Sequence, residues 1–187
     1  MLLALLFAGT TTFAQRFQIG AKAGGNLSNY TGGNVQSDAL AGYHIGGFLN
    51  FKFGEVFSVQ PEVLYSSQGA KFENLGEKTT IKVGYIAIPV MAKVKFNTVY
   101  LEAGPQFSFK TNESGEIPNL PIKSFAKSMD LSLGAGLGYH SKSGFGIGAR
   151  YLAGLSKVGN FDSNNVNPDF KNSVIQLSAF FTLFNNN

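Results

Sequence analysis

Apolar and polar side chains alternate along residues 83–111. The apolar positions in the first half are Ile86, Ile88, Val90, Ala92, Val94 and Phe96. Those in the second half are Val99, Leu101, Ala103, Pro105, Phe107 and Phe109. A period of two predicts β-strands, and the break at Asn97 and Thr98 predicts a tight turn that makes the two strands a hairpin. If Phe96 faces Val99, Lys93 lies opposite Glu102 as a cross-strand ion pair on the polar face.

The same alternation recurs along the rest of the chain. It predicts eight strands, at residues 17–27, 42–53, 57–69, 83–96, 99–111, 129–139, 145–155 and 174–184. The connections between them alternate between long and short, the long ones being 28–40, 71–80, 112–127 and 157–172. Long outer loops, short periplasmic turns and an even strand number are typical of outer-membrane barrels. We therefore predict an all-β fold, an eight-stranded antiparallel up-and-down transmembrane β-barrel of the OmpA and OmpX kind. Both termini are then periplasmic.

Aromatic side chains support this geometry because many of them gather at the short-turn ends of the predicted strands. They are Phe51, Phe53, Phe57, Phe96, Tyr139, Phe145 and Phe184. Such a girdle is expected at a membrane interface. Three prolines argue against the predicted barrel, because each removes a hydrogen bond between paired strands. We expect bulges or local breaks in pairing at their positions, Pro61, Pro89 and Pro105.

Composition narrows the class further. After residue 14 the chain has no long apolar run, so it predicts no transmembrane helix. Residues 1–14 are apolar and end in small side chains, which predicts a secretory signal peptide, and residues 15–187 then form a single barrel domain. There is no cysteine, which excludes disulfide and thiolate chemistry. The net charge of +4 is not concentrated in a basic loop with interleaved aromatics, so no nucleic-acid partner is expected.

Polar side chains on the inward face form the strongest constellation. They are Lys22, His44, Lys52, Gln60, Glu62, Lys93, Glu102, Gln106 and Arg150. The interior of an eight-stranded barrel is just wide enough to be filled by side chains, so these groups are expected to neutralise one another as a structural plug. A transport path or ligand site is the alternative.

Other motifs carry less chemistry. Gly134, Gly136 and Gly138 resemble part of a nucleotide-binding loop, but no helix follows them and their period matches the inward face, so no cofactor is predicted. His44, or His140 with Ser141, could belong to a Ser-His-acid hydrolase such as a lipid deacylase, which requires contact among three groups. Residues 162–169 could gather oxygen ligands for calcium but lack the EF-hand pattern, so a solvated loop is favoured. We predict no catalytic residue and no metal site.

Several stretches together resemble the PorT-like outer-membrane β-barrel family of Bacteroidetes. They are residues 60–69 (QPEVLYSSQG), 85–90 (YIAIPV) with Lys93, 101–106 (LEAGPQ), and 149–151 (ARY) with Gly154 and Leu155. The resemblance implies the bacterial outer membrane, with membrane lipid and lipopolysaccharide as surroundings. One branch of the family is associated with type IX protein secretion, which implies envelope or secretion-machinery proteins as partners.

Four functions follow from these patterns. The favoured one is a small non-enzymatic outer-membrane barrel that acts as a scaffold or surface interaction module. The second, from the resemblance, is a component of type IX secretion or envelope assembly. A soluble carrier of lipocalin type would need the apolar face to point inward, and a lipid-modifying enzyme would need one of the histidines in a working site.

Overall fold

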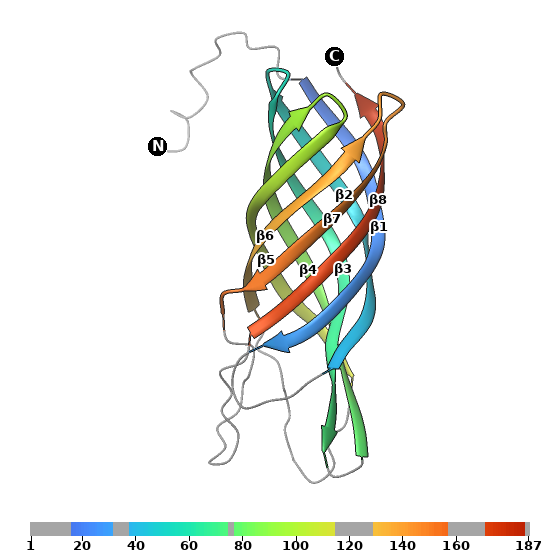
Figure 1. Cartoon of the computed structure of the whole chain (residues 1–187), viewed down its shortest axis with the longest axis vertical. Helices are drawn as coiled ribbons and strands as arrows, with labels where there is room; N and C mark the ends of the chain where they lie inside the picture. Colours follow the sequence, from blue (N-terminus) through green and yellow to red (C-terminus); the bar gives the residue numbers. More distant parts are fainter. Residues whose placement is uncertain (1–15, 32–37, 75–76, 115–128, 157–170, 186–187) are drawn as a thin grey trace, which may run out of the picture.

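The computed structural model of the chain is a closed antiparallel barrel of eight strands (Figure 1). The structure describes residues 16–31, 38–74, 77–114, 129–156 and 171–185. The strands are β1 (Arg16–Thr31), β2 (Asp38–Phe53), β3 (Phe57–Asn74), β4 (Glu77–Phe96), β5 (Val99–Ser114), β6 (Met129–His140), β7 (Phe145–Gly154) and β8 (Lys171–Asn185). Each strand pairs with its neighbours in sequence, and β1 pairs with β8 to close the sheet. The predicted fold class is confirmed.

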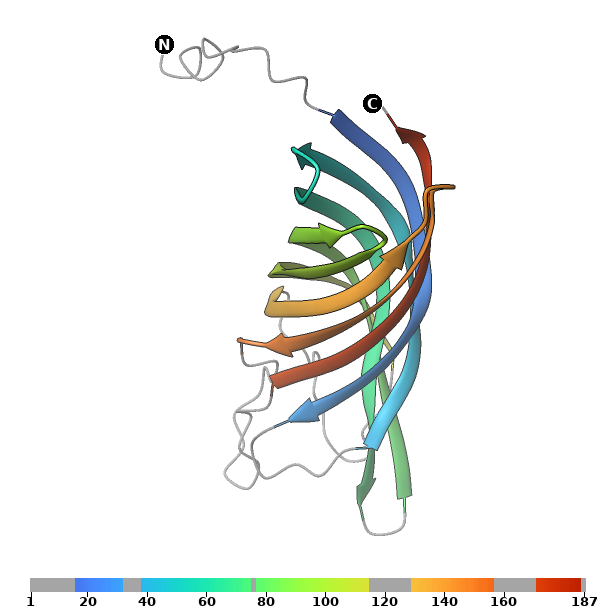
Figure 2. The same ribbon diagram turned by 45° about the horizontal axis from the view of Figure 1, so that its top comes forward.

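The strands extend into all four of the predicted long connections, and furthest into 28–40 and 71–80. β1 continues to Thr31 and β2 starts at Asp38, within the predicted loop 28–40. The predicted connection 71–80 is wrong, because β3 and β4 stay paired until Asn74 lies opposite Glu77. Backbone pairing does not require apolar side chains, so polar residues can continue a hairpin where no core is needed. The outer part of this hairpin projects beyond the neighbouring strands (Figures 1 and 2).

Three short turns join β2 to β3, β4 to β5 and β6 to β7. The backbone turns tightly at Gly54 and Asn97, where φ is 86° and 58°. This left-handed conformation suits glycine, and asparagine tolerates it better than most residues. β1 begins and β8 ends at this same end of the barrel (Figure 1).

The apolar face of the strands points outward and the polar face inward. Leu101, Leu133 and Leu137 are more than half exposed, whereas Glu102 and Ser132, each next to one of these leucines in the chain, are buried. This arrangement contradicts the lipocalin-type alternative, which required the apolar face in the lumen.

One side chain departs from the predicted alternation. The pattern places Phe184 inward with Phe180, but the register between β1 and β8 shifts between Ile19 and Gly20. Both Leu183 and Phe184 are therefore exposed, and Phe184 contacts the ring of Phe17 at a centroid distance of 5.6 Å.

The prolines interrupt pairing without changing the register. Between β3 and β4 the paired positions pass from Pro61 opposite Val90 to Leu64 opposite Ala87, which keeps the same offset. Pairing between β4 and β5 likewise lapses after Pro89 and resumes at Ala92. The missing pairs include Glu62 with Pro89 and Val90 with Pro105, and the pairing of β2 with β3 lapses at Pro61. The predicted local break is therefore present on one side of each of the three prolines, while Pro105 remains paired with Leu133 of β6.

Candidate functional site in the barrel lumen

Five charged side chains from five strands meet in the middle of the lumen. Glu62 of β3 accepts hydrogen bonds from Lys22 Nζ at 2.7 Å and from both terminal nitrogens of Arg150, at 3.1 and 2.8 Å. Arg150 Nε also donates to Glu102 Oε1 at 2.7 Å. Lys93 completes the group, with its Nζ 3.5 Å from Glu102 Oε2. We call this group, Lys22, Glu62, Lys93, Glu102 and Arg150, the charged layer.

The charged layer is sealed from solvent. Its five residues are at most 6% exposed, and Glu62 is 1% exposed. Burial of this kind is costly for a single charge but tolerable when every charge has a partner and a hydrogen bond. Gln60 adds such bonds, because it accepts from Lys93 Nζ at 2.9 Å and donates to Glu62 at 2.8 Å.

The strand register that sets one of these pairs was predictable. Lys93 lies directly opposite Glu102 across β4 and β5, and Phe96 lies opposite Val99, so the predicted register is confirmed. The longer contacts of Arg150 cross the lumen from β7 to β3, which are not neighbouring strands. No pairwise register could indicate them.

An aromatic layer lies toward the short-turn end of the charged layer. Phe48, Tyr100 and Phe180 are buried and form edge contacts, with ring centroids 5.9 Å apart for Phe48 and Phe180. Lys93 Nζ lies 4.0 Å from the centroid of the Tyr100 ring, a favourable cation–π distance. The alternation predicted that these three aromatic side chains point inward. Their residue type, however, did not indicate that they would pack inside a lumen lined mainly by polar side chains.

Amide and hydroxyl side chains fill the lumen on the other side of the charged layer. Asn26 donates to Ser66 Oγ at 3.0 Å, Gln68 donates to Ser66 Oγ at 2.9 Å, and Asn172 donates to Gln68 Oε1. Gln176 donates to Asn26 Oδ1 at 3.2 Å. All but Asn172, which falls in the predicted connection 157–172, lie on inward positions of the predicted strands, and that alternation is the signal that could have identified them.

The nine predicted interior residues therefore separate into two groups. Six of them make one connected network, namely Lys22, Gln60, Glu62, Lys93, Glu102 and Arg150. His44 and Gln106 are buried elsewhere in the lumen, the latter donating to Ser108 Oγ at 3.2 Å. Lys52 lies near the short-turn end, opposite Arg16, and is only partly buried.

Glycines make room for this filling. A Cβ on Gly136 would lie 3.1 Å from Glu102 Oε1 and 2.6 Å from the backbone oxygen of Ala149. A Cβ on Gly138 or Gly148 would lie 2.4 or 2.5 Å from the hydroxyl oxygen of Tyr100. The repeated glycines of β6 thus accommodate lumen side chains, as their inward period indicated.

A serine, a histidine and an asparagine do make contact in the lumen. His44 Nδ1 lies 2.7 Å from Asn26 Oδ1 and His44 Nε2 lies 2.9 Å from Ser178 Oγ. Asn26 donates its own amide to the carbonyl oxygens of Tyr43 and Ser67, so its Oδ1 is the acceptor. Nδ1 of His44 therefore carries the proton, and Nε2 accepts the hydrogen bond from the Ser178 hydroxyl.

We call the contacts among Asn26, His44 and Ser178 the relay. They give His44 the tautomer that a general base needs, but the relay is enclosed within the barrel. His44 is 1% exposed, and a Cβ on Gly24 would lie 2.7 Å from its ring. Base catalysis also requires a substrate within hydrogen-bond reach of the serine. His140 is different again, because its Nε2 lies 3.2 Å from Thr182 Oγ1 rather than from Ser141. The predicted pairing of His140 with Ser141 is therefore absent, and the sequence pattern named no serine for His44, whose partner is Ser178.

The described part of the chain holds no group of three or more His, Cys, Asp or Glu side chains that could bind a metal ion. Within the same residues, no helix is long and apolar enough to cross a membrane. The signal-peptide prediction for residues 1–14 and the loop interpretation of residues 162–169 lie outside the described residues.

A closed eight-stranded sheet with an apolar exterior and a filled polar lumen defines a small bilayer-spanning barrel. The chain belongs to the family described as outer membrane protein beta-barrel domain, whose model matches residues 13–160. This family places it among the barrels of the bacterial outer membrane. A search of curated proteins finds no match.

Solved structures with the same fold include one from Neisseria and one from Yersinia pestis. Neisserial surface protein A is 16% identical, with 89% of this chain and 97% of that chain covered and a TM-score of 0.54. The attachment invasion locus protein Ail of Yersinia pestis is 16% identical, with 90% and 99% covered and a TM-score of 0.51. At these identities the likeness establishes the fold.

Proposed function

We propose that this chain is a non-enzymatic outer-membrane barrel that acts as a scaffold or surface interaction module, with a closed lumen and both termini in the periplasm. The observation that carries the proposal is the position of Glu62, which bridges Lys22 of β1 and Arg150 of β7 across the middle of the barrel. An ion moving along the axis would have to separate these pairs. Separating buried charges leaves each without compensation, which costs several kcal/mol per ion, so on the order of 5 kcal/mol or more opposes an open path.

The outer end of the molecule supports a role in interactions. β3 and β4 are 18 and 20 residues long, whereas β6 and β7 are 12 and 10. The extra length projects as a hairpin at the end opposite the short turns (Figure 1). In outer-membrane barrels the short turns face the periplasm, so this orientation directs the hairpin away from the cell.

Conductance across a planar lipid bilayer tests the closed lumen. The purified protein should give no stepwise currents, because the charged layer blocks the path. The double variant Glu62→Gly and Arg150→Gly removes the bridge and should raise the leak current, while the turn variant Glu55→Gly should behave like the unchanged protein. Regular current steps from the unchanged protein would overturn the proposal.

A fluorophosphonate probe tests the absence of hydrolase activity. It labels serines that a neighbouring base activates, and the serine to check is Ser178 because it contacts His44. We expect no labelling of the folded protein, since the relay is enclosed. Labelling that disappears in Ser178→Ala would contradict the non-enzymatic assignment.

A second candidate is a PorT-like component of type IX secretion or envelope assembly. It rests on the sequence resemblance, and the projecting hairpin of β3 and β4 offers a place for a partner protein to bind. Affinity purification of the intact protein from its own envelope distinguishes the two functions. Recovery of secretion-machinery subunits, lost when residues 72–79 are replaced by a short Gly-Ser turn, would favour this candidate over the first.

A further inference from the structure

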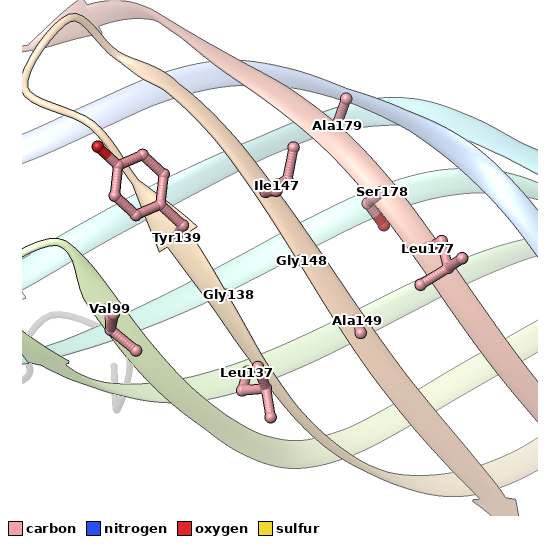
Figure 3. Close-up of a pocket in the computed structure, with 10 residues that line it drawn as sticks. All are labelled: Val99, Leu137, Gly138, Tyr139, Ile147, Gly148, Ala149, Leu177, Ser178 and Ala179. Carbon is pink, nitrogen blue, oxygen red and sulfur yellow. The ribbon is translucent and has the colours of Figure 1, made fainter.

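The outer wall carries an apolar groove near the short-turn end. Its volume is about 550 Å³, within the roughly 300–1,000 Å³ range of small-molecule sites. The groove arises because Ala149 of β7 lies between the larger Leu137 and Leu177 on the neighbouring strands. One row closer to the turns, Ala179 lies beside Ile147. Small side chains flanked by large ones leave a depression in the wall (Figure 3).

The surroundings of the groove restrict what can fill it. The groove lies on the apolar exterior, where Leu137, Ile147 and Leu177 are more than half exposed. In an outer-membrane barrel this face contacts hydrocarbon, and therefore the occupant must be apolar and available in the bilayer. An acyl chain meets both conditions.

Charge at one end of the groove indicates which molecule supplies that chain. Tyr139 lies at this end, and its hydroxyl points toward the turn that joins β6 to β7 (Figure 3). That turn, residues 141–144, contains an exposed Lys142 and the hydroxyls of Ser141 and Ser143 but no carboxylate. Tyrosine is typical of the headgroup level, and lysine there attracts anionic lipid.

We propose that the groove binds one acyl chain of a glycerophospholipid whose phosphate lies beside Lys142. The proposal rests on the orientation in the proposed function, because short turns in the periplasm put this end of the groove in the phospholipid leaflet. The lipid is then a retained ligand of this wall rather than one of many exchanging neighbours.

Native mass spectrometry of the detergent-purified protein, with dioleoylphosphatidylglycerol added, tests the site. We expect a single-lipid adduct that survives mild activation. Ala149→Phe fills the groove and should lose this adduct. The matched control is Ala92→Phe, which adds the same ring to an exposed alanine on β4 outside the groove and should keep it.

A second variant and a folding check keep the test decisive. Heat-modifiable migration on gels shows whether each variant folds, and Ala179→Leu narrows the groove with a smaller change if Ala149→Phe fails to fold. Lys142→Glu should weaken the phosphatidylglycerol adduct while leaving the fold intact.

Three results would overturn the proposal. They are equal adducts in Ala149→Phe and Ala92→Phe, a dimer of the chain that Ala149→Phe abolishes, and displacement of the phospholipid by added lipid A. The closed lumen is tested by conductance, so a missing adduct with no current steps would reject the groove site alone.

Discussion

Leu101 and Glu102 are adjacent in β5, yet they belong to two regions of the molecule with opposite requirements. Leu101 is 52% exposed on the outer wall, and Glu102 is 6% exposed in the lumen. The outer region requires only apolar side chains, because lipid hydrocarbon forms no contacts that are specific to one residue type. The inner region depends on particular partners, since Glu102 must meet Arg150 and Lys93. Stability should therefore be sensitive to residue class outside and to residue identity inside.

The largest effect is expected from Glu62→Gln. The change leaves Lys22 and Arg150 without their shared carboxylate, and breaking a buried pair in this way costs about 3–5 kcal/mol. Urea unfolding of the protein in lipid vesicles measures the loss. The matched Glu55→Gln lies in an exposed turn and should change the free energy of unfolding by less than about 0.5 kcal/mol. A similar small change for both variants would show that the charged layer is not required.

On the outer wall, a charge should matter by depth rather than by partner. Ala135→Lys, in the middle of β6, should lower the free energy of unfolding by about 2–4 kcal/mol if it lies near the bilayer midplane. Val99→Lys, at the short-turn end, should cost only about 0–1 kcal/mol because it reaches the interface. The same vesicle assay compares them, and equal costs would contradict the assigned bilayer depth.

Two neighbouring glycines of β2 allow the most direct comparison of the inner and outer faces of the barrel wall. A Cβ on inward Gly46 would lie 2.0 Å from the backbone oxygen of Val63, whereas one on outward Gly47 would have its nearest neighbour at 3.4 Å. Gly46→Ala should therefore cost about 1–3 kcal/mol through overpacking. Gly47→Ala should be nearly neutral. If unfolding measurements rank the two variants in the reverse order, the assigned inward and outward faces of β2 are wrong.

The smallest effect concerns a single pair within the charged layer. A double-mutant cycle with Lys93→Met and Glu102→Gln should give a coupling energy at the low end of the roughly 0.5–3 kcal/mol seen for contacting residues. It should be low because Glu102 has a shorter contact, 2.7 Å, with Arg150 than the 3.5 Å to Lys93. Zero coupling in the vesicle unfolding assay would mean that the two side chains do not interact.

The alternation was sufficient to predict the strands, their order and the face of nearly every residue. It succeeded because successive side chains of a strand between lipid and a polar lumen must alternate between apolar and polar, and this alternation is visible in the sequence. It failed where backbone pairing continues through mostly polar residues, as where residues 71–74 of β3 pair with residues 77–80 of β4. It also failed at Phe184, where a shift in the register with β1 turns two successive side chains outward.

Sequence alone predicted the class of this protein and the two opposite faces of its strands, but the structure was needed to exclude the lipocalin-type alternative, in which the apolar face points inward. Only the closed sheet decided which charges meet, because Arg150 and Glu62 lie on strands that are separated in the strand order and approach through the lumen. The same closure placed His44 between Asn26 and Ser178, three residues from three strands. Local pattern specifies the direction of each side chain, but contacts across a barrel depend on its curvature, which no single segment contains.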